Sequence, residues 1–233
     1  MTSFQRARSE DQREQRREAI LDAAAAMLSE MSVNDLTLNE LSRRVGLAKS
    51  NVLRYFVSRE AVLLELLHRA YRDWVADLAQ TLPSAVGSGP LEVRVDRTAA
   101  VLTSSVAGRP VLCDLWSAQT GVLERNISAD VAARFKRSAL DDTSAFGREI
   151  VRVVPELGEQ DGLRFAAAAA MIFGAAWTHG RPSPAMQAAY DADPALAVLS
   201  IGFTDTARQL LEVLLSGLLA RSATQVGGRA AGA

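Results

Sequence analysis

The sequence is poor in the residues that build covalent and metal-bound scaffolds, since its 233 residues include one cysteine, Cys113, and two histidines. One cysteine excludes an intramolecular disulfide and a multi-cysteine zinc site, and a lone thiol is typical of a reducing compartment. Long hydrophobic runs are also missing. The longest uncharged apolar stretch, residues 165–177, has 13 residues, whereas a membrane-spanning helix needs about 20. We therefore expect a cytoplasmic protein that does not enter a membrane.

The sequence also lacks the signatures of catalysis. The two histidines, His68 and His179, are not part of an HExxH motif, and we find no phosphate-cradling Gly-rich loop, no Ser-centred elbow and no clustered metal ligands. Asp141 and Asp142 are adjacent, so on a helix they point in different directions. We therefore expect no enzyme, no metal site and no cofactor.

Charge is uneven along the chain. The net charge is −1, so the molecule as a whole does not attract nucleic acid strongly. Residues 41–59 nevertheless contain five cations and no acid, namely Arg43, Arg44, Lys49, Arg54 and Arg59. A charge run is usually only a solvated surface, so its meaning depends on the pattern around it.

Apolar residues recur at helical spacing, and no alternating strand pattern is apparent, which predicts an all-α fold. We expect helices over residues 11–31, 38–45, 49–56, 59–82, 90–107, 110–120, 128–154, 161–177 and 204–221. We expect loops over residues 83–89 and 178–194, the second with a helical turn near 185–190. The predicted domains are residues 10–58 and 59–221, followed by a disordered tail, residues 222–233.

Two short helices joined at a glycine fall within the acid-free segment. Thr37 and Glu40 have the spacing of a capping box, which begins the first helix. Gly46 ends this helix, because a residue with positive φ is needed there. The second helix turns Val52 and Phe56 inward. Two short helices of which the second is basic are typical of a helix-turn-helix, whose second helix enters the major groove of DNA.

Residues 20–67 resemble the DNA-binding domain of the TetR family of repressors. The matching stretches are ILDAAAAML, then LTLNELSRRVGLAKSNVLRYF, then SREAVLLELL. The resemblance implies an N-terminal three-helix helix-turn-helix DNA-binding domain, a fourth linking helix and a larger helical ligand-binding and dimerisation domain. It also implies a homodimer, built mainly from the last two helices, that represses at a palindromic operator until a small, largely apolar effector binds.

The resemblance assigns DNA contacts residue by residue. Base-reading positions fall on Lys49, Ser50 and Leu53. Phosphate-binding positions fall on Thr37, Asn51, Arg54, Tyr55 and Arg59, and we add Arg44 from the acid-free segment.

Three positions depart from the family pattern. Ala48 stands where the family often has Ser or Thr, so the recognition helix lacks that N-cap hydroxyl. Asn51 replaces a common Thr and can still donate to phosphate. Leu53 replaces a common Tyr and cannot form a hydrogen bond, although it can contact a thymine methyl group or pack.

Basic residues also gather before the motif. Arg6, Arg8, Arg13, Arg16 and Arg17 can form an arm that contacts phosphates or the minor groove. The interleaved acids, Glu10, Asp11, Glu14 and Glu18, leave a solvated, charge-balanced segment as the alternative.

The C-terminal part offers candidates for a mostly apolar ligand site. They are Cys113, Trp116, Phe146, Met171 and Trp177, and plain core packing is the alternative for each. The last helix carries more apolar surface than one packed face requires, which favours a partner interface. A helical module that binds protein, or a DNA-binding protein without a ligand, remains open as a different function.

Overall fold

The computed structural model describes the backbone of residues 3–230 and the side chains of residues 10–222, and within residues 3–230 it contains helices and no strand. The N-terminal helices are α1 (Ser3–Leu28), α2 (Leu38–Arg44), α3 (Lys49–Tyr55) and α4 (Arg59–Val86). The next are α5 (Leu91–Ala107), α6 (Pro110–Ala118), a π-helical turn η1 (Gln119–Leu123) and α7 (Ala129–Val153). The last are the 3₁₀ turn η2 (Pro155–Leu157), α8 (Gly158–His179), α9 (Pro184–Ala192), the 3₁₀ turn η3 (Ala197–Leu199) and α10 (Phe203–Ala230).

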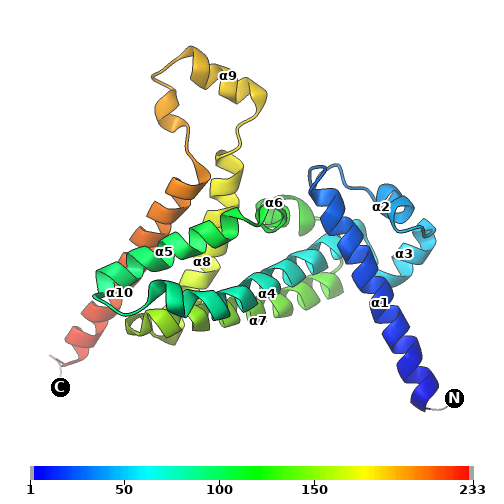
Figure 1. Ribbon diagram of the computed structural model, residues 1–233, viewed down its shortest axis with the longest axis horizontal. Helices are drawn as coiled ribbons and strands as arrows, with labels where there is room; N and C mark the ends of the chain where they lie inside the picture. The colour runs from blue at the N-terminus through cyan, green and yellow to red at the C-terminus, as the bar shows by residue number, and fades with distance from the viewer. Residues whose placement is uncertain (1–2, 231–233) are drawn as a thin grey trace.

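Helices α1–α3 gather at one end of the molecule, and the larger helical part extends from them along α4 (Figure 1). Helix α4 packs against α1, α5, α6 and α7, so it belongs to both parts. Helix α8 packs against α6, α7 and α10, and α10 packs against α5. The all-α prediction is confirmed.

An aromatic cluster fills the core around Trp74 of α4. Trp74 is fully buried, and the rings of Tyr71, Trp116, Phe146 and Phe173 surround it with centroid distances of 5.8, 5.6, 4.7 and 6.0 Å. Its indole Nε1 donates to the Ser105 hydroxyl of α5 at 2.9 Å, which satisfies the one polar atom of the ring. The long linking helix is therefore held by the core of the C-terminal part.

The end of α4 differs from the prediction, because the helix continues through Pro83 to Val86 where we expected a loop. Proline leaves the carbonyl four residues earlier, that of Ala79, without its helical donor. The Arg152 guanidinium of α7 donates to this carbonyl at 3.2 Å. Burial of Leu82 and Val86 also favours the extra turn.

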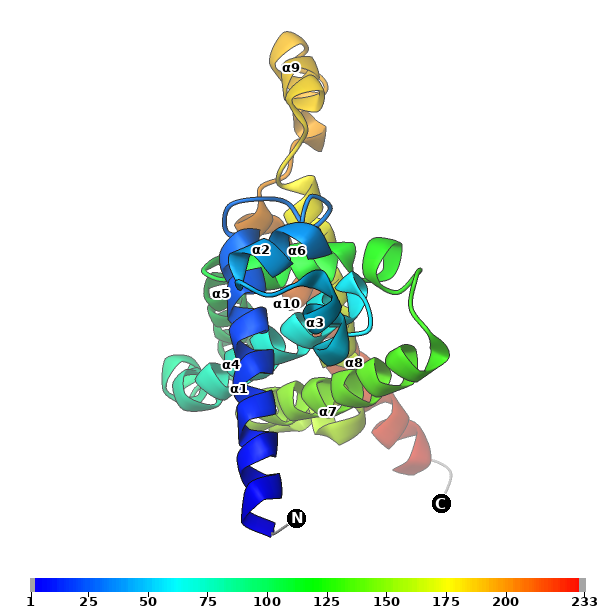
Figure 2. The same cartoon turned by 90° about the vertical axis from the view of Figure 1, so that its right-hand side faces the viewer.

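The predicted loop over residues 178–194 contains a complete helix, α9. The Ser183 hydroxyl accepts from the amide of Met186 at 3.3 Å, and Pro184 occupies the first helical position, where proline is tolerated. No residue of α9 is buried. The segment projects away from the rest of the molecule in both views (Figures 1 and 2).

Both terminal helices are longer than expected. Helix α1 spans Ser3–Leu28 where we expected residues 11–31, and α10 continues to Ala230, over most of the tail that we expected to be disordered. The continued segment, residues 222–230, holds Gly227 and Gly228 as well as Ala223 and Ala230, so helix propensity does not account for the continuation. Residues 231–233 of that tail lie outside the described residues.

Candidate DNA-binding surface and ligand cavity

The turn between α2 and α3 forms as its residues predict. The Thr37 hydroxyl accepts from the Glu40 amide at 3.2 Å and donates to the Glu40 carboxylate at 2.9 Å. The Glu40 carboxylate therefore bonds the Thr37 hydroxyl, whereas in a complete capping box it would accept from the Thr37 backbone amide. Gly46 has φ +66°, a conformation that favours glycine, and the Leu47 amide then donates to the Ser42 carbonyl at 2.9 Å.

Helix α3 is held on one side and open on the other. Val52 and Phe56 are buried, as predicted, and Ala48 makes no side-chain cap. The open side carries the side chains of Lys49, Ser50, Asn51, Leu53 and Arg54, with Tyr55 half-buried at the end of the helix. The structure thus brings the three expected base-reading side chains to one exposed surface.

Two of the other expected phosphate contacts are engaged inside the protein. Arg59 donates to the backbone carbonyls of Val33 and Leu36 and lies 3.2 Å from the Glu60 carboxylate, so its guanidinium braces the loop before α2. Arg44 pairs with Glu30 at the surface, which raises the pKa of Arg44 and lowers that of Glu30.

Helix α1 adds cations beside α3. Arg13 and Arg16 line a groove together with Asn51 and Arg54 of α3. No ion pair forms at Arg13, Arg16 or Arg54 with any side chain in residues 10–222. Arg17 instead joins three helices: it donates to the Tyr55 carbonyl at 2.9 Å, pairs with Glu65 at 2.7 Å and covers the Phe56 ring at 4.5 Å. The side chains of Arg6 and Arg8 lie outside the described set.

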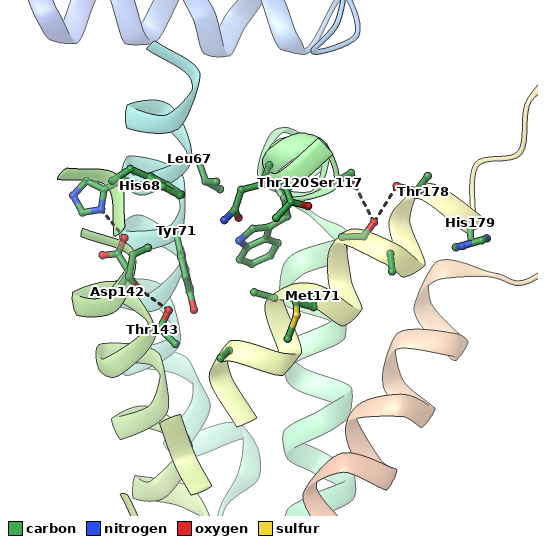
Figure 3. Close-up of a pocket in the computed structure, with 18 residues that line it drawn as sticks. Leu67, His68, Tyr71, Ser117, Thr120, Asp142, Thr143, Met171, Thr178 and His179 are labelled. Carbon is green, nitrogen blue, oxygen red and sulfur yellow. Dashed lines mark hydrogen bonds and ion pairs between the residues drawn. The ribbon is translucent and has the colours of Figure 1, made fainter. Parts of the chain in front are cut away.

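A cavity of about 490 Å³ lies between α4, α6, η1, α7 and α8 (Figure 3). Its walls are largely small, because α7 and α8 contribute alanines and Gly174 to the lining. Gly174 lets α8 cross close to α6, since a Cβ atom there would lie only 3.2 Å from the Trp116 carbonyl and the two helices would have to move slightly apart. Of the expected lining residues, Trp116 and Met171 contribute to this cavity, and Met171 is 69% exposed.

The structure does not bring the other three expected residues to the cavity. Cys113 is packed in the core, where burial raises the pKa of its thiol to about 12, and Phe146 is fully buried beside Trp74. Trp177 donates to Asp114 at 2.6 Å and lines a different hollow, between α8 and the loop after α1.

One end of the cavity is polar. His68 of α4 bonds Asp142 of α7, with 2.5 Å between Nδ1 and Oδ2, and this bond raises the pKa of His68. Tyr71 lies one turn further along α4, and its buried hydroxyl has no hydrogen-bond partner among the described residues. Figure 3 shows His68 and Tyr71 on the same helix with Asp142 opposite them on α7.

Within the described residues, no cluster of histidine, cysteine and acidic side chains could hold a metal ion, and no helix is long and apolar enough to cross a membrane.

Sequence comparison assigns both parts of the chain to one family. Residues 20–66 match the model of the bacterial regulatory proteins of the tetR family, and residues 68–222 match the tetracyclin repressor-like C-terminal domain. The chain belongs to the TetR family. It is therefore a DNA-binding transcriptional regulator and not an enzyme.

Solved TetR-like structures share the fold. The repressor AlkX from Dietzia sp. strain DQ12-45-1b, implicated in n-alkane biodegradation, is 14% identical, with a TM-score of 0.50 over 87% of this chain and 94% of its own. The fatty acid degradation regulator FadR from Bacillus halodurans is 12% identical, with a TM-score of 0.52 over 86% and 98% of the two chains. A search of curated protein sequences finds no significant match.

In this TetR-family chain, α4 connects the cavity to the DNA-binding helices. Leu67, His68 and Tyr71 line the cavity from α4. On the same turn of this helix, between His68 and Tyr71 in the sequence, Arg69 pairs with Glu18 and Asp22 of α1, both at 2.8 Å. A shift of α4 caused by a ligand would therefore move α1 as well.

Sequence reasoning missed the polar end of the cavity. His68 and Asp142 are 74 residues apart, and no spacing rule joins them. Tyr71 and Asp142 also lack any sequence signal that separates them from other residues of their helices. The three-residue step from His68 to Tyr71, which places both on one face of a helix, is the only local hint.

Proposed function

We propose that this chain is a homodimeric repressor that binds a palindromic operator in the cytoplasm and releases it when a small, largely apolar molecule enters the cavity. The observation that carries the proposal is the position of α4. This helix forms one wall of the cavity and is ion-paired to α1 through Arg69, so occupation of the cavity has a mechanical route to α1 and, through the bond of Arg17 to the Tyr55 carbonyl, to α3.

In this proposal α3 lies in the major groove. Lys49 and Ser50 donate to base edges from its first turn, and Leu53 packs against a thymine methyl group. Arg54 and Asn51 contact the phosphate backbone together with Arg13 and Arg16 of α1. These side chains are exposed and form no ion pair with side chains of residues 10–222, which supports this assignment.

The proposed dimer is formed by α8 and α10, which pack side by side. Both helices expose large apolar side chains: Met171 of α8 is 69% exposed and Val213 of α10 is 71% exposed, with Leu163 and Leu210 also at the surface. Apolar surface in excess of one packed face favours an interface. A second copy would bury it isologously, as two-fold symmetry requires.

The exposed segment that contains α9 and η3 also supports a second copy of the chain as the partner. Met186, Val198 and Leu199 are exposed, and no side chain of α9 or η3 is buried. A nine-residue helix without tertiary packing is marginal in water. We propose that this segment packs on the second copy.

Release then follows from a population shift. The two copies of α3 must lie about 34–36 Å apart to enter successive major grooves. A ligand that binds more tightly to a state with another spacing lowers the affinity for DNA by the ratio of its two affinities.

Selection of bound duplexes from a random pool tests the proposal with the full chain. We expect a two-fold symmetric sequence with half-sites one helical turn apart, and a binding constant that falls steeply with salt. Failure to select any duplex at low salt would refute DNA reading, and selection of an asymmetric site by a monomer would refute the dimer.

A further inference from the structure

We propose that the cavity selects a neutral, mostly apolar ligand with one oxygen that accepts a hydrogen bond from Tyr71, and that it rejects carboxylates. This inference rests on the proposed function, because it takes the cavity to be the effector site. The inference goes beyond the proposed function by naming the chemistry of the effector and the side chain that recognises this effector.

The Tyr71 hydroxyl is the first observation. Tyr71 is 5% exposed, lines the cavity, and has no hydrogen-bond partner in the described part of the chain. The Thr143 hydroxyl beside it donates to the Ala139 carbonyl at 2.6 Å, and its contact with Tyr71 lies outside normal hydrogen-bond geometry, so the Tyr71 proton has no full acceptor there. A buried hydroxyl without a partner is costly, so such groups are rare in native proteins. A ligand oxygen would remove this cost.

Two neighbouring hydroxyls on the lining have partners. Ser117 and Thr178 both donate to the Gly174 carbonyl, at 2.9 and 3.0 Å. Tyr71 carries the one buried hydroxyl of this lining that lacks a partner within the described part of the chain. Among the described side chains, one other buried polar atom lacks a partner, the hydroxyl of Thr103 on α5, and Thr103 does not line the cavity.

The charges around Tyr71 decide the chemistry of the ligand. The lining holds no lysine and no arginine. Its one carboxylate, Asp142, is buried and bonded to His68, and its second histidine, His179, is exposed at the end of α8, away from Tyr71 (Figure 3). An anionic ligand would meet Asp142 without an unmatched cation to pair with, and desolvation would add to the cost. A protonated amine would suit Asp142, but it could only donate to the Tyr71 oxygen and would leave the proton of that hydroxyl without an acceptor. A ketone or hydroxyl oxygen accepts it without a charge.

The rest of the surface suits an apolar body. Trp116 and Phe135 offer ring surfaces, and Ala139, Ala167 and Ala170 leave open space between the helices. The volume of about 490 Å³ lies within the range of small-molecule sites. A single polar contact in such a surface fixes the orientation of the ligand.

The first test needs no ligand. Tyr71→Phe removes the unsatisfied hydroxyl and keeps the ring, and Thr103→Val does the same for the second orphan group. We expect both substitutions to raise the melting temperature of the free protein by about 2–4 °C. A melting temperature lowered by Tyr71→Phe would show that the hydroxyl has a partner in the free protein and would overturn the proposal.

The second test uses matched probes on the full chain. Benzylacetone, the alcohol formed by its reduction, the corresponding primary amine and hydrocinnamate share one phenylethyl body and differ at the polar end. At millimolar concentration we expect the ketone and the alcohol to raise the melting temperature of the wild type and of Thr103→Val by about 2–4 °C. Tyr71→Phe should lose most of this shift, and hydrocinnamate should give none.

The proposal is overturned if neither neutral probe shifts the wild type, if Tyr71→Phe responds as the wild type does, or if the carboxylate or amine binds best. Duplex binding by the wild type and by Thr103→Val separates this failure from that of the proposed function. We expect both to bind the selected duplex and to release it when benzylacetone is added, and we expect Tyr71→Phe to resist this release. If the wild type bound the ketone but no duplex, the proposed repressor function would be refuted, and the proposal about the ligand of the cavity would stand.

Discussion

The two ends of this molecule are specified in different ways. The DNA-binding end is built from short-range signals: a cap at Thr37, a positive-φ glycine at Gly46, and two apolar side chains four residues apart, Val52 and Phe56. The cavity is built from residues that meet only in the folded chain, such as His68 and Asp142. The DNA-binding end can therefore be altered one residue at a time, whereas the shape of the cavity depends on how four helices pack together.

The largest loss of operator affinity is expected from substitutions at the proposed dimer interface, because this interface brings the two DNA-binding ends to one operator. Replacing Met171 and Val213 by glutamate should place charges in the interface and give a monomer. A monomer holds one half-site, so operator affinity should fall at least about 100-fold. Leu140→Glu on α7, also exposed, at 58%, is the matched control and should stay dimeric. Analytical ultracentrifugation measures the oligomeric state of the double variant and of Leu140→Glu. A double variant that remained dimeric would show that α8 and α10 do not form the interface.

The arginines at the DNA-binding end should divide into those that contact DNA and those that stabilise the fold. Arg54→Ala should weaken duplex binding about 10- to 100-fold with an unchanged melting temperature, because the Arg54 side chain is exposed and has no ion pair among the described side chains. Arg59→Ala should lower the melting temperature instead, since it leaves the Val33 and Leu36 carbonyls without their donor. Fluorescence anisotropy and thermal denaturation measure the two effects. If Arg54→Ala and Arg59→Ala changed DNA affinity and melting temperature to the same extent, the separation into DNA-contacting and structural arginines would be wrong.

A smaller contrast is expected within α1. Arg17→Ala should cost about 1–2 kcal/mol of folding stability, because it removes the contacts to Tyr55, Glu65 and Phe56 together. Arg13→Ala, four residues earlier and exposed, should leave stability unchanged and weaken DNA binding only a few-fold. Urea denaturation of the two variants tests this, and equal stability losses would count against the bridging role of Arg17.

The smallest effect concerns the cavity and pH. The bond to Asp142 raises the pKa of His68 above its value in the unfolded chain. This contribution to stability is therefore complete below the unfolded pKa, about 6.5, and is lost as the pH rises through the folded pKa. Wild type should exceed His68→Gln in stability by more at pH 6 than at pH 9, as denaturant unfolding at the two pH values would show. The opposite trend would mean that the histidine is neutral when folded.

Much of the fold was predictable from the sequence, and little of the cavity. Ser128 and Pro110 carry local signals, and the helices that begin there, α7 and α6, start within one residue of the prediction. The extension of α4 beyond Pro83 was not predictable, because it depends on Arg152 from another helix. Arg59 could not be recognised as a brace for the same reason, since its acceptors lie in a loop 23 and 26 residues earlier.

The most direct test of the central claim, that α3 is the reading element, uses the one cysteine of the chain. Cys113 is buried, with a thiol pKa raised to about 12, so a cysteine introduced at an exposed position would be the reactive one. A DNA-cleaving iron chelate attached to Ser50→Cys should cut the selected operator at two sites about one helical turn apart. The same reagent on Gln160→Cys, at the exposed start of α8, should not cut. Equal cutting by both variants, or none from position 50 while the operator is bound, would contradict the account.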